Sequence, residues 1–126
     1  ITLVGYGTEI NQILEGADLL TSQGIRAEVI KLDQLTPLDP ALVIQSVRKT
    51  GVLLVAEEHV AQGSVGCRLA AQLELAGLAA RVELINCGGG FVTHGALGLL
   101  RQELSLDGAG IARRALEVLD RVKTTS

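Results

Sequence analysis

Two glutamates and two histidines are the side chains of this chain best suited to proton transfer. Glu57, Glu58 and His59 directly follow an apolar run, and His94 follows a glycine-rich stretch. Gly95, next to His94, completes the set of candidate residues. A carboxylate and an imidazole held together can act as general base and general acid. Because side chains alternate along an extended strand, Glu57 and Glu58 should point to opposite sides, and at most one of them should reach any single pocket.

The same residues also have a structural interpretation, which we prefer to catalysis. In it a glutamate accepts hydrogen bonds from loop N–H groups, and His94 packs against glycines. A metal site would need three or four ligands together, and the chain has no His-x-x-x-His or Cys-x-x-Cys spacing. Cys67 and Cys87 are expected to be free, buried thiols in a reducing cytoplasm.

Two glycine-containing motifs are similar to known fingerprints but incomplete. Gly5-Tyr6-Gly7 and the later Asp33 fit the start of a dinucleotide fingerprint, but Ile10 stands where its third glycine belongs. The segment QGSVG at 62–66 has glutamine where a nucleophile elbow requires glycine. We therefore interpret the first motif as a tight turn and Ser64 as the N-cap of a helix.

The composition favours one folded domain. The chain has 126 residues, of which 48% are hydrophobic, enough for one sizeable core. A net charge of −3 and only two aromatic residues, Tyr6 and Phe91, argue against a nucleic-acid groove. The longest uncharged stretch, 84–100, contains polar residues and consecutive glycines, so no membrane helix is expected. The chain lacks methionine and begins with Ile1, and we interpret it as a fragment of a longer protein.

Short β-branched runs alternate with helical patterns along the chain. Strands are expected at four places: 1–4, 27–32, 52–56 and 81–85. Ser64 and Asp107 are expected to cap helices, and Gly51 to end one. This alternation predicts an α/β fold with right-handed parallel crossovers and helices on both faces of the sheet. Residues 1–123 should form one domain, followed by a frayed tail at 124–126.

Parallel strands bring their carboxyl ends to one edge of the sheet. The segments expected to converge there are 5–8, 33–37, 57–63 and 86–95. Any functional site of this chain is therefore expected at that edge.

Six short motifs, in order along the chain, resemble the C-terminal domain of the transketolase superfamily. Those in the first half are Ile1–Gly7, Pro37–Asp39, Val55–Glu58 and Gly63–Gly66. In the second half, Phe91–Gly95 and Leu106–Ile111 are similar to stretches of the 1-deoxy-D-xylulose-5-phosphate synthases within that superfamily. The resemblance implies a three-layer α/β/α sandwich with a mainly parallel sheet.

The chain departs from the family pattern in three places. The antiparallel edge strand that precedes the parallel strands in the family is missing before Ile1. Cys87–Gly90 stands where a Leu-Pro-Asp-like segment is usual, and Ser105 where glycine is usual.

The superfamily uses thiamine diphosphate and a divalent metal such as Mg²⁺, which lie between two other domains. The resemblance therefore implies no catalytic, cofactor-binding or metal-binding residue in this chain, which alone should be inactive. It implies a structural and dimerisation role, with other domains of the same enzyme and a second subunit as partners. The composition predicts neither a nucleic-acid partner nor a membrane partner. The whole enzyme would be a transferase that decarboxylates pyruvate and joins the two-carbon unit to glyceraldehyde 3-phosphate.

Two other interpretations stay open. A transketolase, a split transketolase subunit or a 2-oxo-acid dehydrogenase β-subunit would share the fold, whereas a free-standing module that binds an anion or a protein would be a different class. The uncharged segment 88–92, with Phe91, is expected either to form an exposed patch that drives self-association or to plug the top of the core.

Overall fold

The computed structural model describes residues 1–58, 63–86 and 104–125, in which strands and helices alternate. The elements are β1 (Thr2–Gly5), α1 (Glu9–Ser22), β2 (Glu28–Lys31), α2 (Ala41–Thr50), β3 (Val52–Ala56), α3 (Val65–Leu75), β4 (Arg81–Ile85) and α5 (Gly108–Thr125). The strands are all parallel, in the order β2-β1-β3-β4. The predicted α/β fold is confirmed, and the bounds of β3 and β4 are those expected from the sequence.

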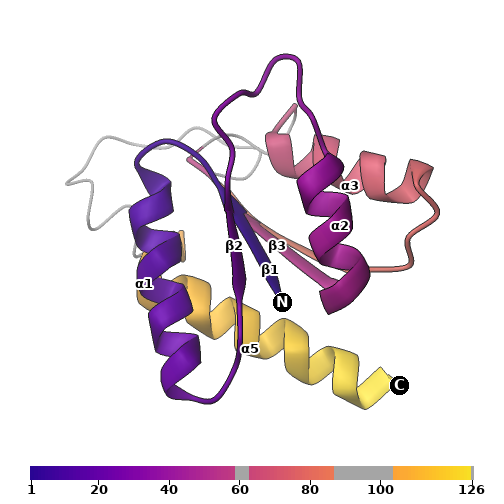
Figure 1. The fold of residues 1–126 in the computed structure, drawn as a ribbon. Helices are drawn as coiled ribbons and strands as arrows, with labels where there is room; N and C mark the ends of the chain where they lie inside the picture. The colour runs from indigo at the N-terminus through magenta and orange to yellow at the C-terminus, as the bar shows by residue number, and fades with distance from the viewer. Residues whose placement is uncertain (59–62, 87–103, 126) are drawn as a thin grey trace.

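The sheet separates two apolar cores, because successive side chains of a strand point to opposite faces. Leu54 and Ala56 of β3 pack with α1 and α5, whereas Leu53 and Val55 pack with α2 and α3. All five residues of β3 are buried, as expected of a parallel strand covered on both faces. Figure 1 shows the resulting three layers, with α1 and α5 on one side of the sheet and α2 and α3 on the other.

Three helix ends lie where the sequence predicts them. Ser64 Oγ accepts a hydrogen bond from the N–H of Cys67 at 3.2 Å, and Asp107 Oδ1 accepts one from the N–H of Gly110 at 2.9 Å. Gly51 ends α2 in the left-handed conformation, with φ of 76°. Each predicted cap thus satisfies main-chain groups that a helix end would otherwise leave open.

The first and last helices approach each other closely at two glycines. A Cβ on Gly16 would lie 2.9 Å from Ile111 Cγ2, and one on Gly108 would lie 2.6 Å from Glu15 Cβ. The N–H of Gly108 donates to Gln12 Oε1 at 3.0 Å across the same contact. Larger residues at either glycine would push the helices apart.

α5 runs to Thr125, so it includes two of the three residues expected to form a tail, while Ser126 lies outside the described residues. No helix in the described part of the chain is both long enough and apolar enough to cross a membrane.

Candidate functional site

The carboxyl edge of the sheet is organised around Glu57, the residue directly after β3. Its main-chain N–H donates to Ile85 O at 3.0 Å, so pairing with β4 continues to this residue. Glu57 is only 1% exposed. A carboxylate so deeply buried needs hydrogen-bond donors around it to offset its lost hydration.

Main-chain donors come from the start of α3. The N–H of Val65 donates to Glu57 Oε1 at 3.1 Å, and the N–H of Gly66 donates to Oε2 at 2.7 Å. The open N–H groups at a helix N-terminus favour a negative charge. Glu57 therefore joins the end of β3 to the beginning of α3, as the structural interpretation of this residue requires.

Tyr6 supplies a third donor from the turn after β1. Its hydroxyl donates to Glu57 Oε1 at 2.8 Å. Burial raises the pKa of Tyr6, and the hydrogen bond to Glu57 and the charges of Glu57 and Glu58 raise it further. The phenol thus stays protonated and serves as a donor.

Gly66 is the residue that permits the close contact with Glu57. A Cβ at this position would lie 2.7 Å from Leu84 Cδ2 and 3.1 Å from Glu57 Oε2. The glycine in the motif at 62–66 thus has a steric role: it lets the start of α3 approach both β4 and the buried carboxylate.

A small cavity lies at this edge. Its volume is about 150 Å³, and it is lined by Tyr6, Gly7, Thr8, Glu9 and Glu58. Glu58 is exposed whereas Glu57 is buried against α3, so the two side chains diverge in the way that strand alternation predicts. The turn that forms one wall needs glycine at position 7, where φ is 61°.

The described residues around this cavity do not suit thiamine diphosphate. Sites for such ligands usually enclose about 300–1,000 Å³, whereas this cavity has about 150 Å³. Its two glutamates would repel a diphosphate. Within the described ranges, no three His, Cys, Asp or Glu side chains are placed to hold a metal ion. The geometry is that of a structural junction between β1, β3 and α3.

Of the five candidate residues, the structure places two. Glu57 and Glu58 lie at the carboxyl edge, and His59, His94 and Gly95 lie outside the described residues, as does segment 88–92.

The expected convergence of segments is observed where the structure describes them. The Tyr6–Glu57 hydrogen bond connects 5–8 with 57–63, and Arg68 Nη2 of α3 donates to Leu35 O in 33–37 at 2.8 Å. The sequence did not single out Tyr6 as a partner of Glu57. The strand pairing could have predicted this contact. The β1–β3 register pairs Val4 with Val55, and continuing the register by two residues places Tyr6 beside Glu57.

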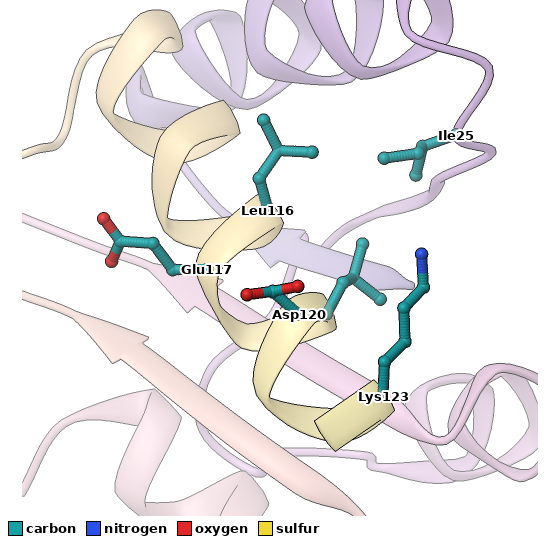
Figure 2. Close-up of a pocket in the computed structure, with 6 residues that line it drawn as sticks. Ile25, Leu116, Glu117, Asp120 and Lys123 are labelled. Carbon is teal, nitrogen blue, oxygen red and sulfur yellow. The ribbon is translucent and has the colours of Figure 1, made fainter. Parts of the chain in front are cut away.

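A larger hollow lies elsewhere, beside the residues that lead into β2. It has a volume of about 570 Å³ and is lined by Ile25, Leu116, Glu117, Leu119, Asp120 and Lys123. Figure 2 shows Ile25 and Leu116 facing the hollow from two different segments, with the charged side chains farther along α5. Its lining combines the apolar side chains of Ile25, Leu116 and Leu119 with three charged side chains of α5.

Comparisons with known proteins show which family this chain resembles. Residues 1–111 match the family model described as transketolase, C-terminal domain. The 1-deoxy-D-xylulose-5-phosphate synthase of Heliobacterium modesticaldum is 36% identical over 120 residues, which cover 95% of this chain and 18% of that protein. The synthase of Dehalococcoides mccartyi strain BAV1 is 32% identical over 121 residues, covering 94% of this chain and 19% of that protein.

A solved structure is also similar. A split gene transketolase, described as an inactive β4 tetramer, superposes with a TM-score of 0.82 and 28% identity over 94% of this chain and 38% of that one. The chain spans less than a fifth of the length of the two curated relatives.

Proposed function

Because this chain belongs to the transketolase C-terminal domain family, we propose that it is the C-terminal domain of a 1-deoxy-D-xylulose-5-phosphate synthase. The whole enzyme is then a transferase that decarboxylates pyruvate and joins the remaining two-carbon unit to glyceraldehyde 3-phosphate. The observation that carries this proposal is the similarity to two bacterial synthases over nearly the whole chain.

In this proposal the chain has a structural role and carries no reacting group. Thiamine diphosphate and Mg²⁺ are held by other domains of the enzyme, which is supported by the small acidic cavity at the carboxyl edge. Glu57, Tyr6 and the start of α3 keep that edge rigid. The partners are the other domains and a second subunit, and the compartment is the cytoplasm. The sequence predicted that Cys67 is buried, and this was wrong: Cys67 is exposed at the start of α3.

A domain exchange tests the proposal. Residues 1–126 replace the matching region of the Heliobacterium modesticaldum synthase, and formation of 1-deoxy-D-xylulose 5-phosphate is measured. We expect the rate to fall by no more than about a hundredfold, the cost of a small misplacement at a domain contact. The control is the parent enzyme with that region deleted, which should be inactive. A folded, dimeric chimera without activity would contradict the proposal.

Titration of the isolated chain tests its structural role. We expect no saturable heat with thiamine diphosphate and Mg²⁺, because two glutamates line the cavity beside Tyr6 and would repel a diphosphate. The whole synthase is the positive control. Binding in the micromolar range would show that this chain carries cofactor-binding residues of its own.

A split transketolase subunit is the second candidate, favoured by the structural superposition. The two candidates differ in the reaction that the chain supports. Substituted into a split transketolase, the chain would restore ketol transfer between sugar phosphates if the second candidate were correct, and the synthase chimera would stay inactive.

A further inference from the structure

β4 lies at an edge of the sheet, with β3 as its partner. The N–H of Arg81 donates to Gly51 O at 3.1 Å, so Arg81 turns its backbone groups toward the β3 side. Since alternate residues of a parallel strand turn their N–H and C=O to the same neighbour, Val82 and Leu84 present theirs to the outer side. No segment among residues 1–58, 63–86 and 104–125 pairs with that side. Such open backbone groups are a template for pairing with another chain.

The side chains of β4 give its two faces different chemistry. On the α3 side they are apolar and only partly buried. On the α5 side Glu83 accepts hydrogen bonds from Arg114 Nε at 3.0 Å and from Arg121 Nη2 at 2.7 Å. Arg81 lies on the same side by strand alternation, is exposed, and has no ion-pair partner among the described residues. The edge therefore offers apolar contacts on one face and an unpaired cation on the other.

We propose that two copies of this chain pair through β4, with antiparallel strands related by a two-fold axis perpendicular to the sheet. Such an axis keeps each side chain on its own face, and the residue on the axis lies opposite itself. With the axis at Val82, the two Val82 residues exchange hydrogen bonds in both directions. The next outward residue, Leu84, exchanges bonds with Ala80 of the second copy. The sheet then continues from one copy into the other.

Charge selects this register. The axis at Val82 sets Arg81 opposite Glu83 of the second copy on both sides of the axis, so the unpaired cation meets a carboxylate. An axis at Arg81 or at Glu83 would set two like charges opposite each other, which is unfavourable. An axis at Leu84 would bring no opposite charges together. The inference concerns the chain by itself, does not rest on the proposed enzymatic function, and differs from self-association through segment 88–92.

Disulfide trapping tests the register. Val82→Cys and its matched control Leu84→Cys are each made in a chain whose Cys67 and Cys87 are replaced by serine. The Cα atoms of a hydrogen-bonded antiparallel pair are about 5.5 Å apart, within disulfide range, whereas the two copies of residue 84 would be offset by about 14 Å along the strands. Mild oxidation should therefore link Val82→Cys into a dimer and leave Leu84→Cys unlinked. Equal or stronger linking of Leu84→Cys, or linking of neither variant, would overturn the proposed pairing.

A charge reversal tests the ion pairs. Arg81→Glu sets a glutamate opposite Glu83 on both sides of the axis, so two attractions become two repulsions. We expect the dimer dissociation constant, measured by sedimentation, to rise about tenfold or more. The matched control is Arg48→Glu, the same change of charge on α2, which packs on β1, β2 and β3. Equal constants for the two variants would overturn the proposed register.

Hydrogen exchange of the unmodified chain tests the open edge itself. Exchange at the amides of Val82 and Leu84 should slow as the protein concentration rises, because pairing covers both amides. Exchange that does not depend on concentration would overturn the proposal. If it were fast, the edge would stay unpaired, and if it were slow, another segment of the same chain would cover it.

Discussion

Two glutamates tie strands to helices in this domain, and they do so in opposite surroundings. Glu57 is buried at the carboxyl edge, where main-chain N–H groups of α3 and the Tyr6 hydroxyl surround it. Glu28 of β2 has a side chain that is 41% exposed, and it accepts hydrogen bonds from Lys49 Nζ and Ser46 Oγ of α2, each at 2.7 Å.

The comparison shows two ways to hold a carboxylate. Around Glu57 two of the donors are backbone N–H groups, whose positions are fixed by helix α3. Because the carboxylate is buried, water does not compete for these hydrogen bonds. Around Glu28 the main charge partner, Lys49, is a flexible side chain that is 64% exposed, so water and salt compete with it. The first arrangement should contribute far more to stability than the second.

The largest effect is expected from Glu57→Ala. It leaves two buried N–H groups and a hydroxyl without their acceptor, which should cost about 2–4 kcal/mol of unfolding free energy. Urea denaturation followed by circular dichroism measures this. Glu58→Ala is the matched control, because the neighbouring glutamate is exposed and should change stability by about 0.5 kcal/mol or less. Equal losses in the two variants would remove the distinction between buried and exposed glutamates.

Tyr6→Phe should have a smaller effect. The ring remains, and the one hydrogen bond lost is that to Glu57 Oε1. A bond to a charged acceptor contributes about 1.5–3 kcal/mol, and partial exposure of Tyr6 places the loss at the lower end. Combining the change with Glu57→Gln in a double-mutant cycle measures the coupling between the two residues. If the effects are simply additive, the tyrosine does not act through Glu57.

The smallest effect is expected from Glu28→Gln, and it should depend on pH. The hydrogen bonds from Lys49 and then Ser46 lower the pKa of Glu28 from its ordinary value of 4.5. A carboxyl with a lowered folded-state pKa contributes stability that is present above the ordinary value and lost as the pH falls through the folded-state value. The melting temperature of the variant should therefore fall less steeply between about pH 6 and 3, the range in which ordinary carboxyl groups titrate. Superimposable profiles would mean that the Glu28 contacts are not maintained in solution.

The sequence predicted the architecture well because local patterns determine it. A continuous apolar run marked β3, and Ser64 and Asp107 marked helix starts through their side-chain oxygens. Alternation after β3 also correctly separated Glu57 from Glu58.

The contacts of the site were harder to predict, because they join residues far apart in the chain. Tyr6 and Glu57 are separated by 51 positions, and their pairing depends on the β1–β3 register. Ser105 shows a different difficulty: it adopts a left-handed φ of 63° where the family usually has glycine. Its Oγ accepts a hydrogen bond from Arg113 at 2.7 Å. The conformational preferences of serine alone do not predict this contact.

The glycine contact between α1 and α5 has a consequence for synthesis on the ribosome. Gly108 donates to Gln12, 96 positions earlier, and Ile111 and Val118 complete the core that α1 begins. The amino-terminal half therefore cannot bury its apolar face until α5 has been made, about 5–20 s later at usual translation speeds. During that interval the nascent chain exposes Ile13 and Leu20, and they are natural contacts for a chaperone.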